Sequence, residues 1–260
     1  MTKAEVEEKP SMHPAIAAAN AIKIVQITGQ TINYEMVLME GYRRFIKPGD
    51  VAVDLGAHAG EHLGQIAHLV GEDGAVYAFE PIPHLAAALR KRFKATPRIH
   101  IREAAVSRER GETDFVVADS LAESGLRAHF FSRPDMPTKS IRVAVETLDN
   151  TLAHLDRLAF IKMDIEGAEI DALSGATAVL ARHRPIVSVE YGWAGYGFYG
   201  HERRSLFDFA AAHSYVCADL FGNLVEDETV WNAVVDFATW DFFLVPSERK
   251  VEWTDAFSLR

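Results

Sequence analysis

The chain has 260 residues, a formal net charge of -10 and one cysteine, Cys217. Its 48% apolar content is ordinary for a globular protein, and the acidic balance argues against a nucleic-acid partner, because phosphates call for a basic surface. A lone cysteine excludes an intramolecular disulfide and is expected to be buried. No apolar run approaches the ~20 residues that cross a bilayer, and the acidic start MTKAEVEEKP does not resemble a signal peptide. We therefore expect a cytoplasmic enzyme or binding protein that needs no membrane.

The elements predicted in chain order alternate between helix and strand. We expect a partly flexible N-terminal extension over residues 1–30 and a single domain over residues 31–260. A helical pattern in TINYEMVLMEGYRRF ends at the turn KPGD. Near-continuous apolar runs then predict strands at 51–55, 75–80, 98–106, 158–164 and 185–191, and helical patterns fill 60–70, 83–94, 167–183 and a short stretch near 149–156. This alternation predicts a doubly wound α/β fold with a mostly parallel sheet covered on both faces.

Two segments depart from the alternation. Residues 107–148 contain the strand-like runs ETDFVVA and IRVAVETL around a long polar stretch, which predicts an inserted hairpin with a long loop. Near the C-terminus, RRSLFDFAAAHS is helical, and YVCADL and WDFFLVPS are strand-like with no helical pattern between them. These last two runs predict an antiparallel hairpin at the edge of the sheet.

The stretch DVAVDLGAHAGEHLGQIAHLVG predicts a strand, a glycine turn and a helix whose N-terminal N–H groups face a ligand. Gly56 and Gly60 allow close approach to the backbone. The spacing G-x-x-x-G lacks the second glycine of the dinucleotide fingerprint G-x-G-x-x-G, so the ligand need not carry a diphosphate.

The second predicted strand ends in FEPIP, where Glu80 precedes Pro81. A carboxylate accepts two hydrogen bonds from a vicinal diol, so Glu80 suits an unphosphorylated ribose. An adenosine-like ligand with a small charged tail is expected. S-adenosylmethionine fits, because it has a free ribose, a cationic sulfonium and no phosphate. Asp54 would act on the amino or sulfonium side of this ligand.

The run KMDIEGAE lies where the fourth predicted strand ends, at the edge of the sheet where ligands bind. We predict Asp164 or Glu166 as a base or substrate clamp, with Lys162 setting their charge. Asp164, Glu166 and Glu190 form an alternative site for magnesium or calcium, which prefer oxygen ligands. The chain has no histidine spacing typical of a transition-metal site.

The segment EYGWAGYGFYGHERR places five aromatic residues among four glycines. Its aromatic faces could stack on a sugar ring or another planar group. A packed cluster over the edge of the sheet is the alternative. We predict five substrate-binding residues in this segment: Glu190, Tyr191, Trp193, Tyr196 and His201. His201 is also a further candidate base.

Six motifs resemble, in their order along the chain, those of FkbM-type methyltransferases, and the resemblance covers roughly residues 35–245. They are VDLGAHAGEH, GAVYAFEPIP, AAVS, VETLDNTL, FIKMDIEGAEIDALSGA and IVSVEYG. The resemblance implies a class I methyltransferase (Rossmann-like) fold with a C-terminal antiparallel hairpin. It also implies S-adenosylmethionine as methyl donor and S-adenosylhomocysteine as product. Carried over by position, the residues that would bind the cofactor are Asp54, Gly56, His58, Gly60, Glu80, Pro81, Ala105 and Asp164. His58 stands where the family usually has asparagine.

The resemblance favours O-methylation of a hydroxyl on a small molecule, such as a sugar, a glycan or a secondary metabolite of natural-product biosynthesis. N-methylation of an amine or hydrazine-like nitrogen is the second alternative. A third is a non-catalytic scaffold that binds S-adenosylmethionine, although a scaffold has no need of the acids at 164, 166 and 190. A homo-oligomer is compatible with all three.

Overall fold

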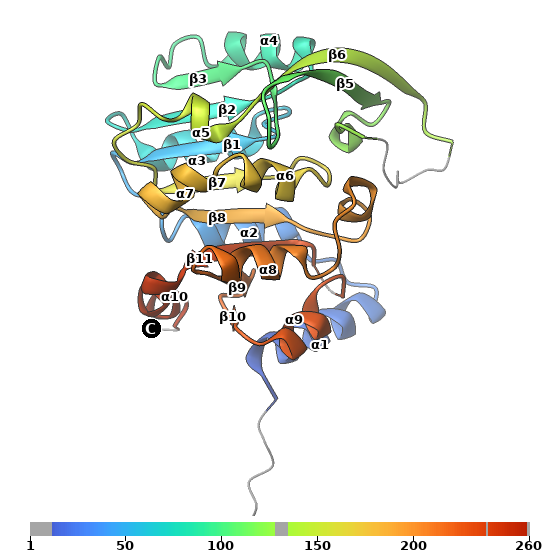
Figure 1. Ribbon diagram of the computed structural model, residues 1–260. Helices are drawn as coiled ribbons and strands as arrows, with labels where there is room; N and C mark the ends of the chain where they lie inside the picture. Colours follow the sequence, from blue (N-terminus) through green and yellow to red (C-terminus); the bar gives the residue numbers. More distant parts are fainter. Residues whose placement is uncertain (1–11, 128–134, 238, 259–260) are drawn as a thin grey trace, which may run out of the picture.

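A computed structural model describes residues 12–127, 135–237 and 239–258. Residues 1–11 of the expected N-terminal extension therefore lie outside the described residues, and its predicted flexibility there stays a prediction. The rest of the expected N-terminal extension contains helix α1, Pro14–Ile27, whose Ala15 and Ala19 are buried in the main core. Figure 1 shows α1 beside the late helix α9, Glu228–Val234.

The central feature is an eight-stranded sheet in the order β10-β9-β11-β8-β7-β1-β2-β3. Its parallel strands are β1 Val51–Leu55, β2 Ala75–Phe79, β3 Ile99–Arg102, β7 Phe160–Met163 and β8 Ile186–Glu190. Strand β11, Asp241–Pro246, inserts antiparallel between β8 and β9, Tyr215–Asp219, and the short β10, Leu224–Val225, closes that edge. The order reverses between β1 and β7, which is where doubly wound sheets bind ligands. The predicted class I methyltransferase fold, with its antiparallel C-terminal pair, is confirmed.

Successive strand residues point to opposite faces of the sheet, so apolar strands present apolar side chains on both faces. Helices cover both of these faces. On one face, Val53 and Ile161 pack under α6 Glu169–Ser174, α7 Thr177–His183, α8 Ser205–Ala212 and α9, with α5 Leu148–Thr151 at the side. On the other, Ala52 and Phe160 pack under α2 Tyr34–Tyr42, α3 Glu61–Val70, α4 Pro83–Arg92 and α10 Lys250–Phe257. Figure 1 shows α6, α7 and α8 in front of the sheet and α2 and α3 behind it.

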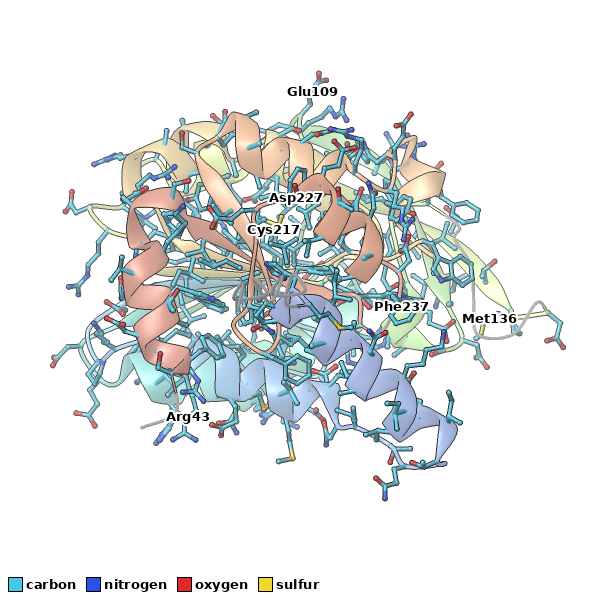
Figure 2. All side chains as sticks on the ribbon, turned by 90° about the horizontal axis from the view of Figure 1, so that it is seen from below. Arg43, Glu109, Met136, Cys217, Asp227 and Phe237 are labelled. Atoms are coloured by element: carbon cyan, nitrogen blue, oxygen red, sulfur yellow. The ribbon has the colours of Figure 1, made fainter. Side chains whose placement is uncertain are left out.

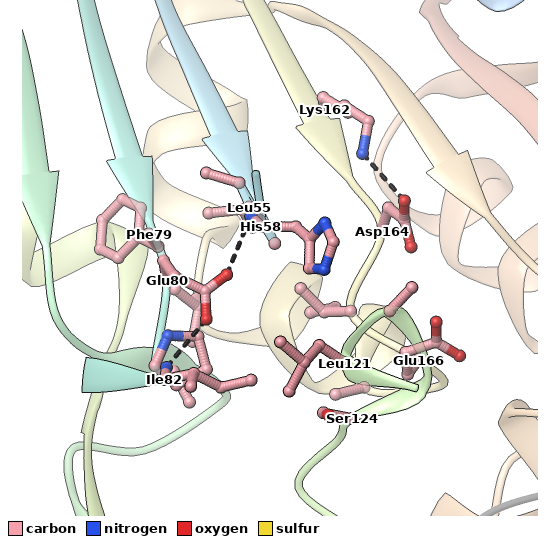
Figure 3. A pocket seen from close by; sticks show the side chains of 18 of the residues that line it. Leu55, His58, Phe79, Glu80, Ile82, Leu121, Ser124, Lys162, Asp164 and Glu166 are labelled. Atoms are coloured by element: carbon pink, nitrogen blue, oxygen red, sulfur yellow. Dashed lines mark hydrogen bonds and ion pairs between the residues drawn. The ribbon is translucent and has the colours of Figure 1, made fainter. Parts of the chain in front are cut away.

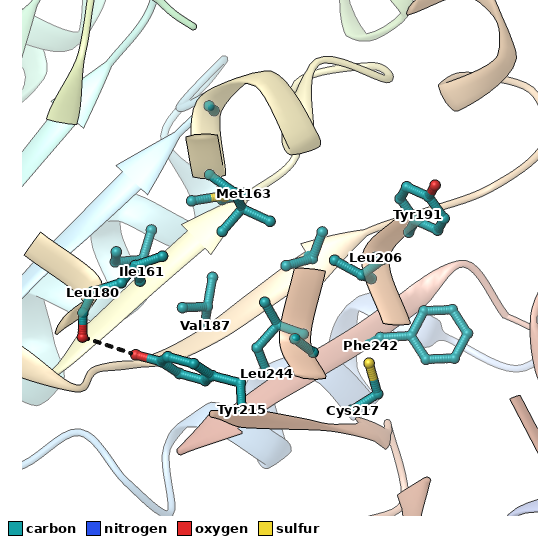
Figure 4. Packing of buried hydrophobic residues seen from close by; sticks show 14 of the residues in the cluster. Ile161, Met163, Leu180, Val187, Tyr191, Leu206, Tyr215, Cys217, Phe242 and Leu244 are labelled. Carbon is teal, nitrogen blue, oxygen red and sulfur yellow. Dashed lines mark hydrogen bonds between the residues drawn. The ribbon is translucent and has the colours of Figure 1, made fainter. Parts of the chain in front are cut away.

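The core around the antiparallel edge is apolar and tightly interleaved. Figure 4 shows Ile161, Val187 and Leu244 from three adjacent strands meeting side chains of the covering helices. Cys217 lies among them, as predicted, and burial raises the pKa of its thiol. In Figure 2 it lies inside the molecule, whereas the charged Glu109 and Arg43 lie at the rim.

A second, three-stranded sheet stands beside the first. It consists of β4 Ala105–Val106, β5 Gly111–Ala118 and β6 Thr138–Glu146, and β5 and β6 pair as an antiparallel hairpin. The 3-10 helix η1, Leu121–Glu123, follows β5. A small separate core, containing Ile82 and Phe115, joins this sheet to the turn after β2. The strand predicted over 98–106 is therefore wrong as one element, since its two halves belong to different sheets.

The prediction that no helix separates the last two long strands is wrong. Helix α9 lies between β9 and β11, and its seven residues bury Val230, Trp231 and Val234. Asp227 caps it by accepting hydrogen bonds from the N–H groups of Thr229 and Val230. Two shorter 3-10 helices, η2 Tyr196–Tyr199 and η3 Ser247–Arg249, complete this half of the chain.

The helix predicted over 167–183 is interrupted at Gly175. Gly175 is the C-cap of α6, and α7 begins two residues later. A Cβ on Gly175 would lie 2.3 Å from the carbonyl oxygen of Ser107, so glycine is needed where this backbone approaches. In the described part of the chain, no helix has the length and apolar character to cross a bilayer.

Candidate functional site

A pocket of about 350 Å³ opens at the carboxyl ends of β1, β2, β7 and β8. This volume is within the range of small-molecule sites, and the position is the switch point of the sheet. Its two ends differ in chemistry. One end is lined by Glu80 and by the apolar side chains of Phe79, Ile82, Ala105, Phe115 and Leu121. The other end is acidic and is lined by Glu35, Asp164, Glu166 and Glu190.

The glycine loop after β1 is shaped by contacts within the chain. Gly56 and Gly60 have φ of 78° and 82°, a region that favours glycine. A Cβ on Gly56 would lie 1.9 Å from the carbonyl oxygen of Asp164, and one on Gly60 would lie 2.6 Å from Leu89 Cδ2. The room left by the missing Cβ atoms is thus occupied by the turn after β7 and by α4. Gly56 lines the pocket, whereas Gly60 caps α3 outside the lining.

Glu80 holds this loop from the end of β2. Its Oε2 accepts a hydrogen bond from the His58 N–H at 2.8 Å, and its Oε1 accepts one from the Ile82 N–H at 2.8 Å. Burial raises the pKa of Glu80, and the two backbone donors oppose that rise. A carboxylate has about four acceptor sites, so two remain for a ligand. Pro81 follows it in the lining.

His58 is one of the few non-glycine residues with positive φ, at 45°, and its side chain lines the pocket. Figure 3 shows the imidazole between Glu80 on one side and Lys162 with Asp164 on the other. Glu166, with φ of 57°, is a second such residue in the lining. Non-glycine residues in this region are uncommon and tend to occur at functional sites.

Asp54 lies under the pocket and is not part of its lining. The side chain is fully buried, and neither carboxylate oxygen has a hydrogen-bond partner among the described residues. Its neighbour in register on β7 is Lys162. Burial raises the pKa of Asp54, and Lys162 opposes this rise through its charge. Asp54 therefore interacts by its charge with Lys162, which does line the pocket.

Lys162 connects this buried acid to the pocket. Its side chain is 3% exposed, and Nζ lies 3.0 Å from Asp164 Oδ2. Burial alone would lower the pKa of Lys162, but the carboxylates of Asp164 and Asp54 outweigh it and raise the pKa. The ammonium is charged at neutral pH as a result.

Asp164 and Glu190 are a hydrogen-bonded pair of carboxyl groups at the acidic end. Burial disfavours both charges, but Lys162 and the hydrogen bond with Glu190 hold the pKa of Asp164 below its usual value. Burial and the charges of Asp164 and Glu166 raise the pKa of Glu190 well above its usual value. These opposite directions favour Glu190 over Asp164 as the carboxyl that keeps a proton.

The predicted alternative metal cluster is brought together in space. Carboxylate oxygens of Asp164, Glu166 and Glu190 lie within 4.8 Å of one another. Lys162 Nζ lies 3.0 Å from Asp164 Oδ2, so a buried ammonium already stands beside these oxygens. Charge repulsion from this ammonium opposes a divalent ion at the same place.

Sequence reasoning missed part of the lining. Glu35 from α2 and His62 from α3 reach the acidic end, where His62 Nε2 lies 2.5 Å from Glu35 Oε2 and His62 Nδ1 lies 3.2 Å from the Tyr42 hydroxyl. The hydrogen bond with His62 lowers the pKa of Glu35. Leu121, Ser124 and their neighbours come from the inserted segment after β5. No local pattern marks these residues, because only the packing of distant elements brings them to the pocket.

The aromatic segment after β8 is largely packed. Tyr191 is buried, its hydroxyl donates to the Glu202 carbonyl, and its ring stacks on Tyr196 at 4.9 Å. The Tyr196 hydroxyl donates to Asp236, and His201 lies 2.8 Å from Asp171. Tyr191, Tyr196 and His201 thus lie outside the lining of the pocket.

Trp193 and Glu190 are the two remaining predicted substrate-binding residues. Trp193 is 46% exposed and meets Trp240 edge-on at 6.1 Å. Trp240 lines a small niche of about 20 Å³ beside the pocket, and Glu190 and Glu166 line both cavities. The structure thus brings Glu190 into the site, whereas Trp193 lies outside both linings and reaches the niche only through its contact with Trp240.

The pocket suits an adenosine-like molecule with a cationic tail. The apolar end and Glu80 match a base and a ribose diol, and the acidic end matches a sulfonium. Among the described residues that line the pocket, Lys162 is the single lysine or arginine, and Asp164 already pairs with it. A phosphate would therefore find no free cation of that kind, which is consistent with the absence of the dinucleotide glycine spacing.

Comparisons with known proteins agree with this chemistry. The family model described as "Methyltransferase FkbM domain" matches residues 54–218. A protein of Sinorhizobium fredii named 2-O-methyltransferase NoeI is 28% identical over 161 residues, which are 56% of this chain and 64% of that protein. A protein-L-isoaspartate O-methyltransferase of Ignicoccus hospitalis is 40% identical over 68 residues, 26% of this chain and 32% of that protein. The chain thus spans less than two thirds of the length of either relative.

One solved structure that is similar to this chain is the methyltransferase FkbM of Methylobacillus flagellatus KT. It is 16% identical, with a TM-score of 0.48, over 89% of this chain and 58% of that chain.

Proposed function

This chain belongs to the FkbM methyltransferase family, and we propose from that premise that it transfers a methyl group from S-adenosylmethionine to a hydroxyl of a small molecule. The observation that carries the proposal is one continuous pocket that joins Glu80 to the acidic end around Asp164. Both relatives are named as O-methyltransferases, which favours oxygen over nitrogen as the acceptor atom. A sugar, a glycan or another hydroxyl-rich metabolite is the expected class of acceptor.

The cofactor would be held along the length of the pocket. Glu80 accepts hydrogen bonds from the ribose hydroxyls through its remaining acceptor sites, with Pro81 beside it. Ala105 and the apolar residues around it cover the adenine. Gly56 and His58 face the methionine part, and Asp54 adds its charge from below through Lys162. When bound, the cofactor supplies a methyl group on a cationic sulfur.

Asp164 is the proposed base for the acceptor. A hydroxyl becomes strongly acidic as its oxygen gains a third bond, to the methyl carbon, so an ionised carboxylate of low pKa suffices to accept the proton. Lys162 keeps Asp164 ionised, and Glu190 and Glu166 stand beside it as hydrogen-bonding partners for neighbouring hydroxyls. Most of the acceleration then comes from alignment, because the methyl group is already activated.

The acceptor would enter between the aromatic rim and the acidic end. Trp240 lines the niche beside the acidic end, and Trp193 packs edge-on against it, so these two residues are the aromatic rim of the proposal. Tyr191, Tyr196 and His201 would support this segment from behind through their buried contacts.

Calorimetric titration with S-adenosylmethionine and S-adenosylhomocysteine, with and without magnesium, tests the cofactor. We expect both ligands to bind wild type, and Glu80→Ala to weaken both by ~100-fold, the equivalent of one or two charge-assisted hydrogen bonds. Glu72→Ala, at an exposed acid remote from the pocket lining, is the matched control. Absence of binding to wild type would overturn the proposal, and a magnesium-dependent affinity would restore the metal alternative.

The acceptor atom is tested with a panel of hydroxyl and amine compounds and a methyl-labelled donor. Label should enter hydroxyl compounds and be lost from them in Asp164→Asn. Label entering amines alone would replace O-methylation with N-methylation. Tight cofactor binding with no transfer to any acceptor would favour a scaffold.

A further inference from the structure

His58 occupies the middle of the pocket. It projects from the loop between β1 and α3, and its ring lies between the Glu80 end and the end formed by Lys162 and Asp164, as Figure 3 shows. Its N–H donates to Glu80 Oε2 at 2.8 Å. This bond ties the backbone of His58 to the carboxylate that the proposed function assigns to the ribose.

The position of His58 relative to the sulfonium follows from covalent structure, and this step rests on the proposed function. The sulfur of S-adenosylmethionine is bonded to the ribose 5′ carbon and carries the methyl group. With the ribose at Glu80 and the acceptor at Asp164, the sulfur lies between these two residues. The imidazole that stands between them in the pocket is that of His58.

We propose that His58 sets the preference of this pocket for S-adenosylmethionine over S-adenosylhomocysteine and makes that preference depend on pH. An imidazole changes from neutral to cationic between about pH 8 and pH 5. A neutral ring tolerates the sulfonium, whereas a cationic ring repels it. S-adenosylhomocysteine has an uncharged thioether in its place and escapes this repulsion. Acidification therefore weakens binding of the donor and spares binding of the product.

Other ionisable groups surround His58 and contribute their own pH dependence. They come from every neighbouring element: Glu35, Glu61, His62, Glu80, Lys162, Asp164, Glu166 and Glu190 in the lining, with Asp54 below and Asp241 beside Glu190. Burial raises the pKa of Asp241 to about 7, so this acid loses charge in the same range. The contribution of His58 is the part that disappears when this residue alone is replaced.

The replacement His58→Asn isolates that part. Asparagine tolerates positive φ better than most residues and keeps the backbone N–H that donates to Glu80. Calorimetry gives the dissociation constants of both ligands between about pH 8 and about pH 5.5. In wild type, the ratio of the donor constant to the product constant should rise about tenfold on acidification, the equivalent of one pKa unit. In His58→Asn the rise should be several-fold smaller.

A second measurement uses wild type alone. In the pH range where imidazoles titrate, binding of S-adenosylmethionine should release protons, because the sulfonium disfavours a cationic ring, and binding of S-adenosylhomocysteine should release fewer. Binding enthalpies in buffers of different ionisation enthalpy report this difference, and equal release by both ligands excludes the proposed repulsion even if the variant fails to fold.

The outcomes separate this inference from the proposed function. A ratio that is flat with pH, that falls on acidification, or that changes equally in His58→Asn would overturn the role of His58 while leaving the cofactor assignment intact. Equal proton release by both ligands would do the same. Failure of both ligands to bind wild type at every pH would instead overturn the proposed function.

Discussion

Replacing Lys162 with methionine tests the electrostatic account of the site. Lys162 is the cation between Asp54, which is fully buried, and Asp164, whose side chain is 39% exposed. Methionine keeps an unbranched apolar chain of similar length, so packing is retained while the charge is removed. The variant leaves two acids without their shared cation.

The expected loss of stability comes from those two acids. Removing one partner of a buried ion pair costs ~3–5 kcal/mol. Water screens part of the charge of Asp164, so most of the loss arises at Asp54. We therefore expect the lower end of this range, about 3 kcal/mol at pH 8. The exposed Lys91→Met serves as control and should change the free energy of unfolding by no more than ~0.5 kcal/mol.

The pH dependence of Lys162→Met has a definite sign. Without the cation, burial raises the folded-state pKa values of Asp54 and Asp164 above their unfolded values near 3.9. Acids with raised folded pKa values lose stability as pH rises from the unfolded pKa through the folded one. The deficit relative to wild type should therefore be smaller at pH 5 than at pH 8.

Urea unfolding followed by tryptophan fluorescence measures both quantities, and an unchanged m value shows that the same surface unfolds. A deficit below ~1 kcal/mol at pH 8, or one equal at both pH values, would refute the reasoning, because a buried carboxylate without its cation must cost more than an exposed one.

Gly56→Ala should lower the free energy of unfolding by at least ~2 kcal/mol, because its Cβ would lie 1.9 Å from the Asp164 carbonyl oxygen at a φ of 78°. The control is Gly197→Ala, whose Cβ would have nothing within 4 Å and which should move the thermal midpoint by no more than roughly 2 °C. Equal shifts of the thermal midpoint in the two variants would contradict the contact at Gly56. Burial raises the pKa of Glu169 to about 8, so wild type should lose stability relative to Glu169→Gln as pH rises from about 5 to 8, and a constant difference in denaturation free energy would contradict the raised pKa. Asp164→Asn should lower kcat by ~100-fold or more on any hydroxyl acceptor while S-adenosylhomocysteine still binds; a change confined to KM would make Asp164 a substrate-binding residue and not the base.

The local elements of the parallel half follow from neighbouring residues. Strand β1 occupies the predicted residues 51–55, and α3 begins one residue after the predicted helix start at 60. Here an apolar run, a glycine turn and a helical period succeed each other within about twenty residues, so the signals are local. Glu80 is found at the end of β2 for the same reason, since Pro81 prevents the strand from continuing.

The elements that were predicted wrongly depend on distant contacts. Helix α9 has seven residues, too few for a clear helical period, and its burial against α1 stabilises it. The run 98–106 has no turn residue to divide it, but two different sheets provide its hydrogen-bond partners. The aromatic segment after β8 carries the residues of a stacking site, yet Tyr191 packs into the core.

For the site, local pattern was enough to identify the carboxylates at the ends of β2 and β7, because ligands bind where parallel strands end. It could not show that Asp54 lies beneath the pocket with Lys162 between it and Asp164, since that order depends on the register of β1 against β7. Nor could it bring Glu35, His62 and the segment after β5 to the same cavity. Secondary structure arises from interactions between near neighbours in the chain, whereas the lining and charge of a pocket arise from strand pairing and helix packing between residues far apart in it.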